Sequence, residues 1–183
     1  MAFTEDQVYL DKIKSGENSS YSFLVDRYKD MVYAIALKIL NNPEDAGDAT
    51  QECFIKAFRQ IHQFKGKSKF STWLYTIIYR IAVSKLKENR VATVTISEDH
   101  HENHLTSELD NQSEQLQAKQ TQYFVRQAIE KLPNMEALLV TLHYINDLSI
   151  REVGEITSLS TANIKVKLFR ARKKLERDLT FLL

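Results

Sequence analysis

The sequence is poor in cysteine, proline and glycine, with one, two and four of these residues among 183. Because proline and glycine interrupt helices, their scarcity favours a mostly helical chain. The single cysteine, Cys53, cannot form an internal disulfide, so we expect a reducing, cytoplasmic location. No apolar run approaches the roughly 20 residues that span a bilayer, and no basic segment precedes an apolar one at the N-terminus. We therefore expect neither membrane insertion nor a signal peptide.

Basic residues are missing from one stretch in the middle of the chain. Residues 91–118 carry six acidic side chains and no Lys or Arg, whereas residues 1–90 and 119–183 have net charges of +3 and +4. This asymmetry is hidden in the overall charge of +1. Two basic parts around an acidic middle indicate a polyanionic partner for the flanks.

Helical periodicity divides the chain at the same places. Apolar residues recur at helical spacing before residue 90 and again after residue 119, whereas residues 91–118 are polar and lack periodicity. The fold class we predict is all-α, with two small helical domains, residues 1–90 and 119–183, joined by a flexible acidic linker, residues 91–118.

An acidic face is expected on a helix over residues 43–62, which Asn42 and Pro43 should start. Asp45, Asp48 and Glu52 fall at spacings of three and four beside Gln51. Acids early in a helix also favour its dipole, and that alone would explain them. A functional alternative is docking of a basic protein partner, since an acidic face is a poor surface for DNA.

The segment from Phe64 to Lys87 combines a loop of alternating lysines with an aromatic-rich helix. Phe70 and Trp73 fall on the expected core stripe of this helix, and Tyr75 and Tyr79 on or beside the opposite face. Positive charge interleaved with flat rings can bind a phosphate backbone and stack on unpaired bases. A solvated basic face over core aromatics is the structural alternative.

A helix-turn-helix is predicted near the C-terminus. Ser149 and Glu152 form a capping-box pattern at the start of a short helix, and a break over residues 158–160 precedes a basic helix. Gly154 is small where the two helices should cross. A recognition helix places its first residues against base edges and its flanks against phosphates, so this pattern favours DNA binding.

Three histidines in the linker, His100, His101 and His104, are the candidates for a metal site. No second cluster of ligands accompanies them and Cys53 is distant in sequence, so we expect neither a metal nor a cofactor.

Taken together, three stretches resemble a bacterial RNA polymerase sigma factor of the extracytoplasmic-function (ECF) group. Residues 45–61 resemble the region 2 helix that binds the polymerase clamp, and residues 64–82 resemble the promoter-melting segment. Residues 148–175 resemble region 4, which binds the −35 element. The chain departs from the usual family pattern at Arg80, where asparagine is common, and at Ser158, where glycine is common.

The resemblance implies an alternative sigma factor that directs core RNA polymerase to promoters and helps open the duplex without being an enzyme. It assigns core-polymerase binding to Asp45, Asp48, Gln51 and Glu52. It assigns −10 DNA binding to Phe64, Lys65, Lys67, Lys69, Ser71, Tyr75, Thr76, Tyr79 and Arg80. It assigns −35 DNA binding to Thr161, Asn163, Lys165, Val166, Lys167, Arg170 and Lys173. An anti-sigma factor is a further expected partner, and no small-molecule substrate is expected.

Two other functions remain open from the residues alone. One is a stand-alone helix-turn-helix transcriptional regulator, which would leave the acidic face and the aromatic basic segment without a role. The other is a metal-dependent enzyme that uses the histidine cluster, although no ligand spacing supports it.

Overall fold

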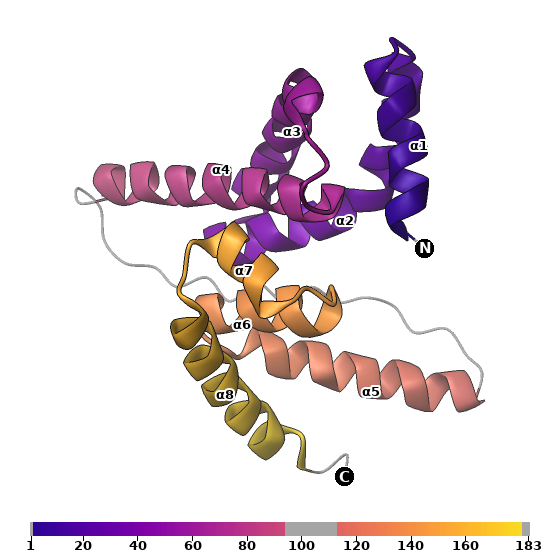
Figure 1. The fold of residues 1–183 in the computed structure, drawn as a ribbon. Coiled ribbons are helices and arrows are strands. Elements are labelled where there is room, and N and C mark those ends of the chain that lie inside the picture. The colour runs from indigo at the N-terminus through magenta and orange to yellow at the C-terminus, as the bar shows by residue number, and fades with distance from the viewer. Residues whose placement is uncertain (1, 94–112, 181–183) are drawn as a thin grey trace.

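The protein is described by a computed structural model, which places residues 2–93 and 113–180. All regular elements in these two ranges are helical (Figure 1). The predicted all-α class is thus confirmed. None of the described helices is both long enough and apolar enough to span a membrane.

Four helices make up the N-terminal half. They are α1 (Ala2–Lys14), α2 (Tyr21–Leu40), α3 (Pro43–Gln60) and α4 (Phe70–Thr93), with single 3-10 turns at Asn18–Ser20 and Ile61–Gln63. Helix α2 contacts both α3 and α4, and α3 also contacts α4. In Figure 1, α1 and α3 project to one side of α4.

The turn between α2 and α3 follows from local sequence. Asn41 adopts a left-handed conformation (φ 54°) that ends α2. The Asn42 side chain then accepts hydrogen bonds from the backbone N–H groups of Glu44 and Asp45, at 2.9 and 3.1 Å. Pro43 occupies the first helical position, where a missing N–H costs nothing. The predicted start of this helix is confirmed.

A buried carboxylate fixes α1 to α2. Asp6 is only 5% exposed and accepts hydrogen bonds from Arg27 Nη1 (2.8 Å) and the Tyr28 hydroxyl (2.6 Å). Burial, and then the hydrogen bond to Asp6, raises the pKa of Tyr28 above its usual range. The N-terminal helix is therefore an integral part of this half.

The C-terminal half contains α5 (Ser113–Glu130), α6 (Asn134–Val140), a π-helical turn (Thr141–Ile145), α7 (Ile150–Thr157) and α8 (Thr161–Asp178). Helices α7 and α8 contact each other, and α6 packs on α8. Helices α4 and α5 enter the two ends of the range expected as a linker, since residues 91–93 and 113–118 are helical. The three linker histidines lie outside the described residues.

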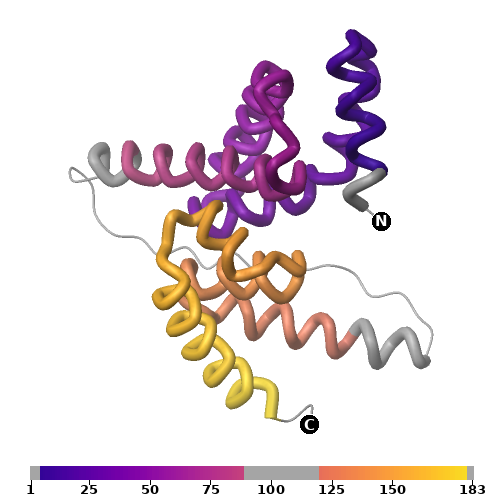
Figure 2. Tube along the Cα trace, viewed as in Figure 1, coloured from indigo at the N-terminus to yellow at the C-terminus, as the bar shows by residue number. Residues whose placement is uncertain are grey.

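The two halves share one apolar core. Helix α7 packs against α4, and α6 packs against α2. The buried side chains form a single cluster that includes Leu74 and Ile78 of α4 together with Val153 and Ile156 of α7. Figure 2 shows α7 directly below α4, on the side opposite α1 and α3. No sequence pattern indicated this packing, which determines what each half exposes.

Candidate functional site

The acidic face of α3 is present as expected. Asp48, Gln51 and Glu52 are exposed, and Asp45 is half-buried. The opposite face buries Ala46, Ala49, Cys53 and Ala57 against the core. The same helix also exposes two apolar side chains, Ile55 (54%) and Phe58 (36%).

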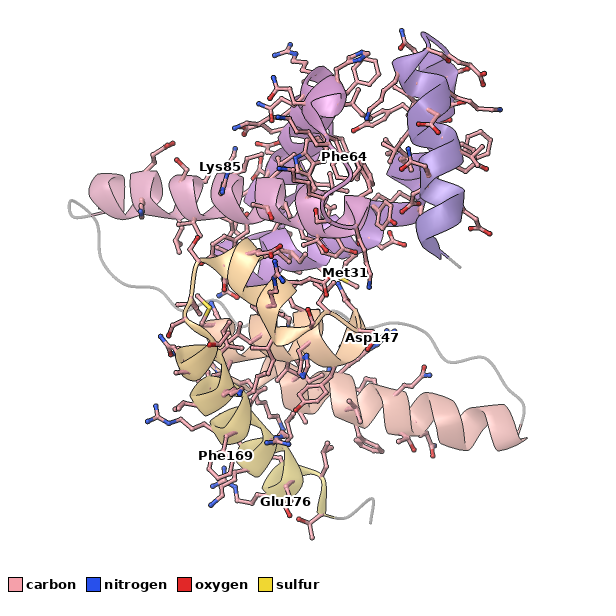
Figure 3. All side chains as sticks on the ribbon, in the orientation of Figure 1. Met31, Phe64, Lys85, Asp147, Phe169 and Glu176 are labelled. Carbon is pink, nitrogen blue, oxygen red and sulfur yellow. The ribbon has the colours of Figure 1, made fainter. Side chains whose placement is uncertain are left out.

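The loop between α3 and α4 separates an anchored aromatic residue from three exposed lysines. Phe64 is buried, with its ring 5.3 Å from that of Trp73 and 5.8 Å from that of Phe70 between centroids. Lys14 of α1 donates a hydrogen bond to the Phe64 carbonyl at 2.8 Å. Lys65, Lys67 and Lys69 follow it and all face solvent. Figure 3 labels Phe64 beside α3 and above the start of α4.

Helix α4 corrects one prediction and confirms another. Phe70 is 2% exposed and Trp73 packs against the core, as predicted. Tyr75 was expected on the opposite face, but it is also buried, at 5% exposed, and meets the ring of Tyr28 edge-on with centroids 6.3 Å apart. The reason is that α2 packs on the side of α4 that the periodicity assigned to solvent.

The other predicted −10 residues remain accessible to different degrees. Ser71, Thr76 and Tyr79 are half-buried, and Arg80 is exposed. Arg80 lines a polar cavity of about 360 Å³ between α3 and α4, together with Glu52, Lys56 and Lys85. Lys85 forms an ion pair with Glu52 at 3.9 Å. Arg80 therefore lies beside the acidic face of α3.

The helix-turn-helix forms with the predicted caps. The Glu152 carboxylate accepts hydrogen bonds from the Ser149 N–H (2.9 Å) and hydroxyl (2.7 Å), while the Ser149 hydroxyl accepts one from the Glu152 N–H. Ser158 takes the left-handed turn conformation (φ 60°) that glycine adopts more easily. A Cβ on Gly154 would lie 3.2 Å from the Leu159 carbonyl oxygen, so the crossing needs a small residue there.

The recognition helix α8 presents the predicted residues to solvent. Ile164, Leu168 and Ala171 are buried on one side. Six of the seven predicted −35 residues are exposed and Lys167 is half-buried. Lys173 lies over the Phe169 ring at 5.0 Å from its centroid, and Figure 3 labels Phe169 on α8.

An apolar surface beside the recognition helix was not predicted. Tyr144, Val166 and Phe169 are each about half exposed and line a cavity of about 480 Å³ with Lys165 and Arg172. The aromatic residues of this surface are plain in the sequence. Tyr144 lies in the π-helical turn after α6, which no sequence pattern indicated.

Comparison with known families decides what this arrangement is. Residues 24–91 match Sigma-70 region 2, and residues 125–175 match Sigma-70, region 4. The chain belongs to the sigma-70 family, in its ECF group.

Relatives extend this match over nearly the whole sigma factor. This chain is 29% identical over 179 residues to the ECF RNA polymerase sigma factor SigW of Bacillus subtilis, and the alignment covers 93% of this chain and 94% of SigW. This chain is also 27% identical over 177 residues to the ECF RNA polymerase sigma-E factor of Escherichia coli, and the alignment covers 93% of this chain and 92% of the sigma-E factor. Proteins of this family are not enzymes.

A solved structure has the same fold. The sigma factor RpoE from Bartonella quintana, in complex with the anti-sigma factor NepR, superposes with a TM-score of 0.66 at 17% identity, covering 87% of this chain and 96% of RpoE. The match spans both halves of the chain.

A polar contact in this sigma factor joins region 4 to region 2. The Thr72 hydroxyl of α4 donates to Glu152 Oε1 of α7 at 3.2 Å. Burial opposes ionisation of Glu152, but the hydrogen bonds from Ser149, the charge of Lys69 and the Thr72 hydroxyl together lower its pKa below the usual value. Sequence reasoning found Glu152 as a cap and missed this second role.

Metal chemistry has no support in the part of the chain that the structure describes. In residues 2–93 and 113–180, His, Cys, Asp and Glu side chains form no group of three or more that could hold a metal ion. The metal-dependent enzyme considered from the sequence therefore gains no argument from these residues.

Proposed function

We propose that this alternative sigma factor binds core RNA polymerase through α3, reads the −35 duplex through α8 and handles the −10 strand through the lysine loop and α4. The observation that carries this proposal is the coexistence of three surfaces in one chain. They are the exposed carboxylates of α3, the loop of Lys65, Lys67 and Lys69, and a capped helix-turn-helix.

On α3, the proposed contact is electrostatic. Asp48 and Glu52 lie one turn apart and are both exposed, so a basic surface of core polymerase can approach both. Exposed Ile55 lies one further turn along and can add apolar contact. Such charge complementarity mainly accelerates association and fixes the orientation of the partner.

For the −10 strand, the proposed contacts divide into phosphate and base contacts. The three exposed lysines suit phosphates, whereas Thr76, Tyr79 and Arg80 offer hydrogen bonds and a ring for stacking. Phe64 and Tyr75 support these groups from the core. Extruding a base costs a few kcal/mol, which stacking and edge hydrogen bonds can recover.

On α8, Asn163, Val166 and Arg170 are exposed on the outer side, with Lys165 and Lys167 flanking them. A helix in the major groove reads base edges with its outer side chains while the flanking cations contact phosphates. We also propose the cytoplasm as its location, no covalent chemistry of its own, and the division into domains 1–90, 91–118 and 119–183. An anti-sigma factor is a further proposed partner, since RpoE has one.

The test is binding to purified core RNA polymerase. The wild type should co-elute with the core enzyme in gel filtration, and Asp48→Arg/Glu52→Arg should abolish co-elution. Asp26→Arg/Asp30→Arg is the matched control, since it makes the same two charge changes one turn apart on exposed positions of α2. A stand-alone regulator would not co-elute with the core enzyme. If the control variant also lost binding, the result would not support a specific contact between α3 and the polymerase.

A further inference from the structure

Helix α1 lies outside the residues that match Sigma-70 region 2, which begin at residue 24. One face of α1 nevertheless belongs to the N-terminal core, because Asp6, Leu10 and Ile13 are buried on it. Lys14 follows Leu10 by four residues, so it lies on the same face of the helix, and it is half-buried. Asp6 attaches the first part of this face to α2, and Lys14 attaches its end to the loop between α3 and α4.

Lys14 contacts Phe64 in two ways. Its ammonium group donates a hydrogen bond to the Phe64 carbonyl at 2.8 Å, and it lies 5.7 Å from the centroid of the Phe64 ring. A hydrogen bond from a charged donor is about twice as strong as one between neutral groups, and a cation over a ring adds attraction. Because the two residues are 50 positions apart, this contact fixes the loop to a separate helix.

Phe64 is the residue at which the lysine loop begins. Its ring meets that of Phe70, at the other end of the loop, edge-on with centroids 5.8 Å apart, and both rings lie next to Trp73. Between these two anchors the chain has only residues 65–69, and Gly66 turns it with a left-handed conformation (φ 67°). The position of Phe64 therefore determines where the three lysines of this short loop lie.

The contact with Lys14 ties the Phe64 backbone to another element. The Phe64 N–H is bonded locally, to the Ile61 carbonyl at 3.1 Å, whereas the Phe64 carbonyl is bonded to α1. A loop that is held at both ends loses less conformational entropy when its cations bind phosphates than a loop that must first be ordered. Apparent affinity falls in proportion to the fraction of molecules in the binding-competent form.

We propose that Lys14 of α1 is a positioning residue for the −10 strand, because its hydrogen bond to the Phe64 carbonyl holds the lysine loop in the form that binds phosphates. This inference rests on the proposed function, since it requires that the lysine loop contacts the −10 strand. Lys14 acts through Phe64 and not through a DNA contact of its own. Helix α1 thereby becomes part of the −10 surface although it lies outside the region 2 match.

The first test examines the anchor in the full chain without DNA. Trp73 is the only tryptophan of the chain, and its ring centroid lies 5.3 Å from that of Phe64, so its fluorescence reports on the position of Phe64. In Lys14→Met, which keeps a long unbranched side chain and removes the donor, acrylamide should quench Trp73 more strongly than in the wild type. Lys14→Arg keeps a charged donor and should restore the wild-type quenching.

The matched control is Lys12→Met. Lys12 is an exposed residue of the same helix, and its ammonium group pairs with the Glu17 carboxylate at 3.7 Å. This variant removes the same charge from α1 and should leave the quenching of Trp73 unchanged. Wild-type quenching in Lys14→Met, or an equal increase in Lys12→Met, would overturn the proposal.

Promoter opening by the holoenzyme is the second readout, with variants that co-elute with core polymerase. On a promoter fragment that the wild-type holoenzyme transcribes, the permanganate reactivity of the −10 thymines should fall about tenfold in Lys14→Met, because losing a hydrogen bond to a charged group shifts an equilibrium by roughly that factor. Lys14→Arg and Lys12→Met should open the promoter as the wild type does.

The variant Lys65→Ala/Lys67→Ala/Lys69→Ala separates failure of this inference from failure of the proposed function. If this triple variant opens the promoter normally, the lysine loop does not handle the −10 strand, and both ideas are wrong at this point. If it fails to open the promoter while Lys14→Met opens it as the wild type does, the positioning role of Lys14 is refuted and the proposed function stands.

Discussion

The two predicted DNA surfaces differ in how far the protein itself covers them. In the C-terminal half, six of the seven predicted residues are exposed and one is half-buried. In the N-terminal half, only four of nine are exposed, whereas three are half-buried and two, Phe64 and Tyr75, are buried. The proposed duplex reader is thus an outer face of a small helix pair. The segment proposed to handle the −10 strand is part of the main core and packs against the other half of the chain.

Because of this difference, we expect DNA affinity and folding stability to vary independently among variants of the C-terminal half. In the N-terminal half we expect them to change together. Substitutions on the outer side of α8 should change DNA affinity and leave folding unaffected. Substitutions in α4 should often change both. Stability measurements must therefore accompany every functional measurement on α4.

The largest expected effect is at Tyr75. Tyr75→Ala should reduce the free energy of unfolding by about 3–5 kcal/mol, because it removes a buried ring from the α2–α4 contact. Tyr79→Ala should cost clearly less, since Tyr79 is half-buried. Urea denaturation monitored by circular dichroism measures both, and Tyr75→Phe, which keeps the ring, is the control. If Tyr75→Ala were as stable as the wild type, Tyr75 would not be a core residue and would again be a candidate for contact with DNA.

A smaller decrease in stability is expected at the attachment of α1. Asp6→Ala should reduce the free energy of unfolding by about 2–3 kcal/mol, because it leaves the Tyr28 hydroxyl and one Arg27 nitrogen without their buried acceptor. Glu5→Ala removes an exposed acid from the same arginine and should cost no more than about 1 kcal/mol. If Asp6→Ala and Glu5→Ala decreased the free energy of unfolding equally, the burial of Asp6 would not explain its contribution to stability. Affinity for −35 duplex should not change.

On α8, the expected change is in binding rather than folding. Lys165→Ala or Arg170→Ala should weaken duplex binding and reduce the slope of log affinity against log salt by about 0.9 for each phosphate that the variant no longer neutralises. Stability should stay within about 0.5 kcal/mol of the wild type, because both side chains are exposed. Fluorescence anisotropy at several salt concentrations measures the slope, with Arg151→Ala on α7 as the control. A slope unchanged in both variants would place the phosphate-binding residues elsewhere.

The smallest effect concerns Cys53, which lies on the buried face of the acidic helix α3. Burial raises the pKa of its thiol to about 12, so at pH 8 only about one molecule in ten thousand carries the reactive thiolate. Ellman's reagent should react very slowly with the folded protein and rapidly after unfolding in guanidinium. Rapid reaction in the native state would show that α3 does not pack as described.

Local signals in the sequence predicted the helix-turn-helix and the acidic face well. Asn42, Ser149 and Glu152 act through neighbours within three residues, so their capping roles could be predicted from spacing alone. The burial of Tyr75 could not, because α4 is covered on more than one side and a single apolar stripe does not describe such a helix. The contact between Thr72 and Glu152 joins residues 80 positions apart and depends on how two helical halves pack.

The central claim is that α3, the lysine loop and α8 together make this chain a promoter-specificity factor. Run-off transcription by core RNA polymerase on a library of promoter fragments tests it most directly. We predict discrete transcripts with the wild type and with Asp26→Arg/Asp30→Arg, and none with Asp48→Arg/Glu52→Arg. Absence of promoter-specific transcripts with the wild type, or equal transcription by the Asp48→Arg/Glu52→Arg variant, would contradict it.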